Sequence, residues 1–162
     1  MLYLFFGLFL AVGLGILGTG VRAWIKSNAV GGWPSTWGTL TERELVESSD
    51  SDGTTYRVKV RYLYRVAGVE YAADRIAFGY GGSSGYASHR ALHEKLASGD
   101  AVQVRYNPRA PGEAALAHGF NRSTLFLLIF GTVWTLFTVG LFALFFLSER
   151  PDTALLERVI VR

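Results

Sequence analysis

The loop from Gly81 to Gly85 has a sequence that could perform nucleophilic catalysis. It reads Gly-Gly-Ser-Ser-Gly, which matches the G-x-S-x-G motif of a serine held on a turn between a strand and a helix. Asp100 and His118 follow in the chain order of a catalytic triad. That motif belongs to large, mostly parallel sheets, and a Gly/Ser loop matches it freely. We therefore keep a serine hydrolase based on Ser83 as an alternative and assign no catalytic residue.

Two histidines have the spacing of metal ligands. His89 and His93 are four residues apart, which places both on one face of a helix. The H-E-x-x-H order is absent because Glu94 follows the second histidine, and His118 is the only other imidazole. The chain has no cysteine, so thiolate ligands and disulfides are excluded. We expect a solvated helix face, with no metal and no cofactor.

A literal G-x-G-x-x-G match at 13–18 lies inside a long apolar run. The dinucleotide fingerprint works only between a strand and a helix, so helix packing is the better interpretation. Gly7, Ala11, Gly15 and Thr19 recur every four residues and predict a stripe of small side chains. This stripe could pack on the bulky second apolar run of the same chain, or on a second copy of the protein.

Two uncharged runs predict membrane-spanning helices. Leu2–Val21 and Leu125–Leu147 carry no charged side chain, and at about 1.5 Å per residue each can cross a hydrocarbon core of roughly 30 Å. A cleaved signal peptide is the alternative for the first run, although no Lys or Arg precedes it. We predict transmembrane helices at 1–22 and 125–148, an exposed domain at 23–124 and a short polar tail at 149–162.

The charges argue against nucleic acid as a ligand. Residues 22–124 have 13 Lys and Arg against 10 Asp and Glu, and the whole chain has a net charge of only +3. Arg22, Lys26 and Arg122 flank the spans on the domain side. They favour a cytoplasmic domain only slightly, because the positive-inside rule loses force in loops longer than about 60 residues.

The exposed domain reads as a small antiparallel sheet. From Tyr56 to Val66, apolar and cationic residues alternate, which indicates a strand with one buried face. We expect a meander of strands at 38–47, 54–66 and 69–78, then a helix at 88–97 with Ser88 as its N-cap, a strand at 101–106, and a strand or turn near 114–117. We expect a turn over 48–53 and another at 67–68. With these turns each cation of the 54–66 strand would face an acidic residue of a neighbouring strand, which partly neutralises its charge. The expected pairs are Glu44–Arg57, Glu42–Lys59, Arg61–Asp74 and Arg65–Glu70, with Tyr64 opposite Tyr71.

Three tryptophans follow the first span. Trp24, Trp33 and Trp37 suit the membrane–water interface, where one end of the ring is apolar and the other is wet. Packing beneath the domain is the alternative, and we expect it for Trp37.

Motifs at both ends of the domain resemble a known family. The opening is Trp33-Pro34-Ser35-Thr36-Trp37-Gly38, Gly68 lies in the central part, and the close is Val104-x-Tyr106-Asn107-Pro108-x-x-Pro111. This series is similar to the bacterial membrane family called domain of unknown function 3592, over about residues 30–120. The resemblance implies an architecture between two spans, in a bacterial inner membrane, and no reaction. From the residues themselves, the two prolines end a strand and Asn107 stabilises a turn.

Together these features predict a two-helix transmembrane hairpin carrying a small α+β domain on an antiparallel β-meander. The expected function is a non-enzymatic interaction, accessory or scaffold module of the envelope, with membrane lipid and a protein partner or second copy as contacts. The alternative from a different class is a membrane-anchored ligand sensor that uses the loop 79–86.

Overall fold

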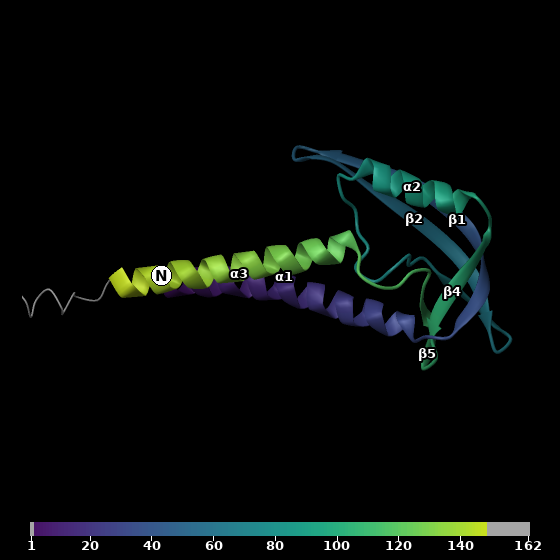
Figure 1. Ribbon diagram of the computed structural model, residues 1–162, viewed down its shortest axis with the longest axis horizontal. Helices are drawn as coiled ribbons and strands as arrows, with labels where there is room; N and C mark the ends of the chain where they lie inside the picture. The colour runs from purple at the N-terminus through teal and green to yellow at the C-terminus, as the bar shows by residue number, and fades with distance from the viewer. Residues whose placement is uncertain (1, 149–162) are drawn as a thin grey trace, which may run out of the picture.

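The computed structural model describes residues 2–148. Two long helices lie side by side, and a five-stranded sheet with one short helix is carried at one end of the pair (Figure 1). The long helices are α1, Leu2–Gly31, and α3, Arg122–Ser148. Both are long and apolar enough to span a membrane, and most of their large apolar side chains are exposed, as a lipid environment requires. The predicted membrane hairpin with a mixed α+β domain is confirmed. The polar tail predicted at 149–162 lies outside the described residues.

Small residues bring the two helices together. Both helices bury small residues at intervals of seven. On α1 these are Gly13, Gly20 and Ser27, and on α3 they are Thr124, Gly131 and Thr138. A Cβ atom at Gly131 would lie 2.8 Å from the backbone nitrogen of Leu17, so only glycine fits there. The seven-residue repeat keeps this seam continuous along the antiparallel pair.

The stripe predicted from the sequence is not this seam. Gly7, Ala11, Gly15 and Thr19 are all exposed, and a Cβ atom added at Gly7 or Gly15 would meet nothing within 4 Å. The intrachain part of that prediction is therefore wrong. The small residues that contact α3 recur at seven, whereas the stripe at four drifts to another face of the helix. Contact with a second copy stays a prediction.

The helix α1 does not end near residue 22, where we placed the domain boundary. It continues to Gly31 and carries Trp24 within its exposed surface. The Nη1 atom of Arg105 donates to the carbonyl of Gly31 at 3.2 Å, which satisfies one of the free carbonyls at the helix end. The last turns of α1 thus contact the domain directly.

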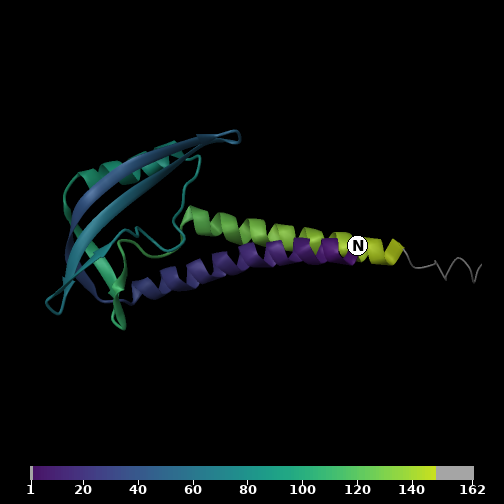
Figure 2. The same ribbon diagram turned by 180° about the vertical axis from the view of Figure 1, so that it is seen from behind.

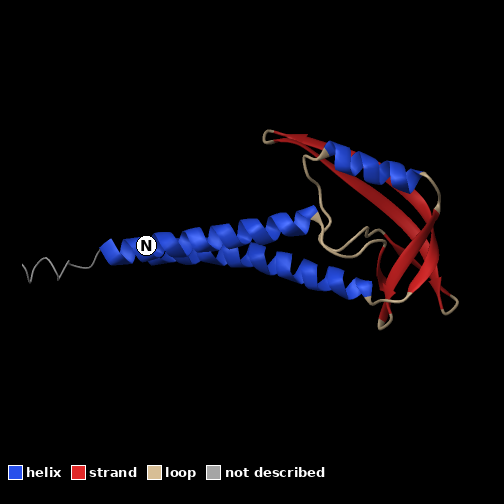
Figure 3. Cartoon of the chain, in the orientation of Figure 1, coloured by secondary structure: helices blue, strands red, loops and turns tan. Residues whose placement is uncertain are grey.

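The sheet has the order β3-β2-β1-β4-β5, with every neighbouring pair antiparallel. The strands are β1 (Ser35–Asp50), β2 (Gly53–Val66), β3 (Val69–Ala73), β4 (Ala101–Asn107) and β5 (Ala110–Ala115). The first three form the predicted meander, although the third strand stops at Ala73 instead of 78. The chain then crosses one face through α2, Tyr86–Ala97, and returns to pair β4 with β1. Figure 3 shows α2 lying against the long β1–β2 ribbon.

Two local features change the predicted register. The β1–β2 turn contains only Ser51 and Asp52, because Asp50 pairs with Gly53. A bulge between Leu40 and Glu42 reverses the face that alternate residues of β1 take, so that Leu40 points inward and Glu42 points outward. The predicted partners Glu44–Arg57 and Glu42–Lys59 are wrong, and the observed pairs are Glu44–Lys59 and Glu42–Arg61. The β2–β3 register is the predicted one, but β3 ends at Ala73, so Arg61 and Asp74 are not strand partners. Arg65–Glu70 and Tyr64–Tyr71 are confirmed.

The core lies between the inner face of the sheet and α2. Tyr62 and Val104 are fully buried there, next to Val60 and Tyr64. Residues from α2 and from the 74–80 segment complete it: Ile76, Tyr80, Leu92 and Leu96. Burial of the Tyr62 ring raises the pKa of this phenol far above its usual range. The Tyr62 hydroxyl donates to the Arg75 carbonyl at 2.9 Å.

The segment after β3, residues 74–80, connects the sheet to the ends of α1 and α3 that lie next to the domain. Gly79, at φ +74°, lies so close to Thr124 and Ala23 that a side chain there would clash with both. The Asn121 side chain donates to the Phe78 carbonyl and accepts the Thr124 amide, each at 2.8 Å, and so caps α3 while holding the segment. The view from behind in Figure 2 shows the same junction between the helix pair and the sheet.

Candidate interaction surface

The Gly/Ser loop does contain a serine bonded to a histidine, but not to the one expected. Ser83 Oγ lies 2.8 Å from His89 Nε2, and His89 Nδ1 lies 2.9 Å from the Tyr80 hydroxyl. His118 instead lies against Gly31 at the end of α1, and Asp100 pairs with Arg43. The structure therefore does not assemble Ser83, Asp100 and His118 as a triad.

These hydrogen bonds form one continuous chain. The Tyr80 oxygen accepts the amide of Val58 at 3.0 Å and also bonds to His89 Nδ1. His89 Nε2 bonds to Ser83 Oγ, which also accepts the Gly85 amide at 3.4 Å. The backbone of Ser83 is paired with that of Tyr56. The chain of bonds ties α2 and the loop to β2.

His89 is a buried residue of the core and not part of a solvated face. Its side chain is 6% exposed, and burial lowers the pKa of the imidazole, so it is neutral at neutral pH. Both of its ring nitrogens are engaged by Tyr80 and Ser83, which leaves none facing His93. Ser88, the predicted N-cap, lies inside the first turn of α2, because Gly85 precedes the helix. The Ser88 hydroxyl accepts a bond from Arg122 at 3.4 Å.

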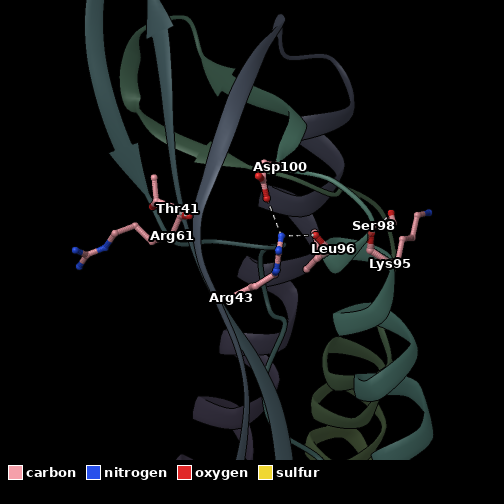
Figure 4. Close-up of polar contacts among 7 residues, drawn as sticks. All are labelled: Thr41, Arg43, Arg61, Lys95, Leu96, Ser98 and Asp100. Carbon is pink, nitrogen blue, oxygen red and sulfur yellow. Dashed lines mark hydrogen bonds and ion pairs between the residues drawn. The ribbon is translucent and has the colours of Figure 1, made fainter.

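Sequence reasoning missed Arg43, which the bulge in β1 turns inward. Figure 4 shows its guanidinium between the Asp100 carboxylate, at 2.9 Å, and the Leu96 carbonyl, at 3.2 Å. The arginine thus holds the end of α2 and the start of β4 against β1. The predicted outward pairing of Glu42 and Glu44 implied an inward Arg43, but its partners could not be predicted, because they depend on how α2 and β4 pack against β1.

An open groove of about 1060 Å³ lies beside the same elements. Residues 40–44 and 57–61 line it from the sheet, and residues 74–77, 79 and 80 line it from the segment after β3, together with Asp100. Its charges are mixed, and Gly79 and Tyr80 bring the start of the predicted ligand loop into its wall.

The outer face of the sheet is a second uncovered surface. The helix α2 packs on the opposite, inner face. Trp37, at the start of the central strand, is 71% exposed, so the expectation that it packs beneath the domain is wrong. It precedes Gly38, whose partner Tyr64 faces inward, and strand alternation therefore points Trp37 outward. Lines of charge continue along the face, with Glu42 and Glu44 on β1 beside Arg61 and Lys59 on β2.

The motif residues of the sequence have structural positions. A Cβ atom at Gly38 would lie 2.7 Å from the Leu63 carbonyl, and Gly68, at φ +82°, forms the β2–β3 turn. Asn107 donates to Glu113 at 2.9 Å and accepts the Arg109 amide at 3.0 Å in the β4–β5 turn, beside Pro108. The remaining motif contacts are Trp33 edge-on to Phe78, the Pro34 carbonyl to the Tyr106 amide, the Thr36 hydroxyl to the Arg65 carbonyl, and the Pro111 carbonyl to the Tyr64 hydroxyl.

Comparison with known proteins agrees with this placement. The family profile described as "Domain of unknown function (DUF3592)" matches residues 36–121, which is more than half of the chain. Neither the search of curated proteins nor the search of solved structures gave a match. The matched region contains all five strands from Thr36 onward, α2 and the two turns that the motifs build. The chain therefore belongs to the DUF3592 family.

Proposed function

We propose that this protein is a non-enzymatic interaction module, anchored in the bacterial inner membrane by its helix pair, which presents the outer face of its sheet to a protein partner. The observation that carries the proposal is the uncovered sheet face with Trp37 at its start, 71% exposed. A large aromatic ring so placed gains hydrophobic stabilisation when a partner covers its exposed surface.

The composition of the face favours protein over other ligands. Acidic and basic residues alternate across β1 and β2, so the surface presents no concentrated positive field for a nucleic acid or an anionic membrane. The face also lies on the side opposite α2 and the loops that lead to the helix pair (Figure 1), away from the membrane-spanning segments. Exposed aromatic and arginine residues are the types that dominate the binding energy of protein interfaces.

The rigid mounting of the domain supports an accessory or scaffold role. Asn121, Arg105 and Gly79 fix the sheet to both helices through short contacts. The outer face therefore has a defined position relative to the membrane, and a partner bound there would be positioned as well. Arg22, Lys26 and Arg122 at the domain end of the spans favour the cytoplasmic side.

Site-specific photo-crosslinking in the native membrane tests the proposal. A photo-reactive amino acid in place of Trp37 should give a discrete covalent adduct with a protein after illumination. The matched control carries the same group in place of Lys95, which is exposed on α2 on the other side of the sheet. Crosslinking at 37 with none at 95 supports the outer face as the interface. A chain that stays uncrosslinked at 37 contradicts the proposal.

The groove beside β2 favours a second candidate, a membrane-anchored ligand sensor. Its volume suits a small molecule, and Tyr80 connects its wall to the His89 and Ser83 bonds of the loop. Native mass spectrometry of the detergent-purified protein tests this. A small molecule retained by the wild type and lost in Tyr80→Phe would support the sensor, and an unliganded mass for both would oppose it.

A further inference from the structure

We infer that the pocket between the end of α1 and the β4–β5 turn binds the headgroup of an anionic phospholipid from the surrounding bilayer. The pocket has a volume of about 350 Å³, which is at the small end of the range for ligand sites. Lys26, Ala29 and Trp33 line it from α1 and the residues after it, and residues 107–109 and Glu113 line it from the turn. The inference goes beyond the proposed function, since it concerns another surface and another ligand.

The position of the pocket along α1 places it beside the polar headgroups of the bilayer. The uncharged run ends at Val21, and at about 1.5 Å per residue Lys26 lies roughly 7.5 Å farther along the helix. The polar layer on each side is about 5–7.5 Å thick, because a hydrocarbon core of about 30 Å lies within a bilayer of about 40–45 Å. Arg22 therefore lies at the inner edge of the headgroup layer and Lys26 at its outer edge. Figure 1 shows the end of α1 next to β5, on the domain side of this layer.

Cationic side chains lead from the membrane into this pocket. Arg22 and Lys26 are four residues apart on α1, so they share one face of the helix, and both are exposed. Arg109 lines the pocket from the turn. Within residues 2–148, neither the guanidinium of Arg22 nor that of Arg109 has a hydrogen bond or an ion pair. Each is therefore available to hold a phosphate through two parallel hydrogen bonds.

The acidic residue that lines the pocket is already engaged. Glu113 accepts from Lys26 Nζ at 2.7 Å and from Asn107 Nδ2 at 2.9 Å, one bond to each carboxylate oxygen. The bond from Lys26, followed by that from Asn107, holds the pKa of this carboxyl below its usual range, so Glu113 stays ionised and orients Lys26. An ammonium group has three donors, and two of those of Lys26 remain for a phosphate. With Arg22 and Arg109, three cations oppose one carboxylate, and the site attracts an anion.

The surface on the membrane side of the pocket suits an acyl chain, which favours a lipid over a dissolved anion. Gly15, Thr19, Arg22 and Lys26 follow one another at intervals of four, three and four, so they lie on one face of α1. Gly15 and Thr19 are exposed, and a Cβ atom added at Gly15 would meet nothing within 4 Å. An acyl chain can therefore lie against the helix there while its phosphate reaches Arg22 and Lys26. Basic pockets at the ends of membrane helices bind anionic headgroups in this way.

Native mass spectrometry of the full chain in detergent tests the inference, with phosphatidylglycerol as the probe and phosphatidylcholine of the same acyl chains as the control lipid. The wild type should retain one phosphatidylglycerol at a concentration at which it retains no phosphatidylcholine. Arg109→Gln leaves the Lys26–Glu113 bond in place. It should weaken the binding of phosphatidylglycerol by roughly fivefold, which is the effect of one basic residue near an anionic lipid surface. Arg22→Gln together with Arg109→Gln should weaken it further.

The matched control is Arg122→Gln, which removes the same charge next to the second span but outside the pocket. It should bind phosphatidylglycerol as the wild type does. Equal losses in Arg109→Gln and Arg122→Gln would show a general attraction to basic residues and overturn the inference, as would equal retention of the two lipids. An excess of inorganic phosphate should not displace the lipid, because it has no acyl chain. Displacement by phosphate would identify a site for a dissolved anion and overturn the lipid as the ligand.

Discussion

His89 connects three parts of the domain through one neutral ring. Because burial lowers the pKa of the imidazole, the unfolded chain takes up a proton more readily than the folded chain just below the ordinary pKa of about 6.5. The free energy of unfolding should therefore fall as the pH falls through this range. His89→Gln keeps a hydrogen-bonding side chain without the titration. It should be less stable than the wild type at pH 8 by about 1–3 kcal/mol, with a flatter dependence on pH.

Denaturant unfolding of the detergent-solubilised protein between pH 8 and pH 5 measures this difference. The two proteins differ at residue 89 alone, so the difference between the two curves isolates His89. Parallel curves would show that the buried ring does not couple protonation to folding.

The two tryptophans of the opening motif should respond differently to the same substitution. Trp33 is partly buried and meets Phe78 edge-on, with 6.0 Å between ring centres, so Trp33→Ser should cost about 1–3 kcal/mol of stability. Trp37 is 71% exposed, so Trp37→Ser should change the stability of the monomer by less than about 0.5 kcal/mol. Thermal unfolding in detergent measures both, and equal losses would contradict the exposed position of Trp37.

At the scale of residues, the sequence could predict which residues lie in turns but not which side chains bond to one another. Gly68 and Asn107 were correctly expected at turns, because their conformational preferences are local. The partner of Ser83 was not predictable, since His89 and Tyr80 reach it through the folding of the loop onto β2. Trp37 was misplaced because alternation along a short segment does not reveal which face another element covers.

The α1–α3 seam gives a prediction with controls inside the same helices. Gly131→Leu would drive a side chain into the backbone of Leu17, whereas Gly140→Leu meets nothing within 4 Å. The first should weaken the helix pair by about 1–3 kcal/mol or more, and the second should have little effect. Gly13→Leu and Gly15→Leu form a second matched pair, because only Gly13 contacts Trp134 and Thr135.

Trp134 reports the separation of the helices, since it stacks on Phe9 at 5.4 Å and donates to the Phe9 carbonyl. Its change in fluorescence in an SDS titration should come at lower SDS for the variants at 13 and 131. Similar transitions for Gly131→Leu and Gly140→Leu would mean that the glycine seam does not determine the pairing.

At the scale of elements, hydrophobic periodicity located the strands and helices but not all of their ends or their register. The last strand, expected near 114–117, is Ala110–Ala115. Alternation between Tyr56 and Val66 located β2 because its faces differ so clearly. The two-residue turn at Ser51 moved the charge pairs by two positions, which conserves the face while changing the partners, and the bulge at Thr41 shifts only the pairing of residues 38–40. The small residues of α1 were recognised, but a repeat of four was chosen where the observed contact follows a repeat of seven.

The whole molecule places its domain and the far ends of its helices on opposite sides of a membrane. Since α1 and α3 are antiparallel, Lys95 on α2 and Ser148 at the end of α3 should lie on different sides. The length of the two apolar runs predicted this hairpin directly, whereas the orientation depends on a few charges near the spans. Arg22, Lys26 and Arg122 at the domain end are expected to keep the domain in the cytoplasm.

Single cysteines in this cysteine-free chain give the orientation. In intact cells with a permeable outer barrier, a membrane-impermeant maleimide should label Ser148→Cys and spare Lys95→Cys, and inverted vesicles should show the reverse. Both sites are exposed or at a helix end, so a difference in labelling reports the side and not burial. Labelling of both cysteines from one side would refute the two-span hairpin itself, because only a membrane between them can separate the two thiols. The reversed pattern would keep the hairpin and place the interaction surface outside the cytoplasm, where its partner would then have to be sought.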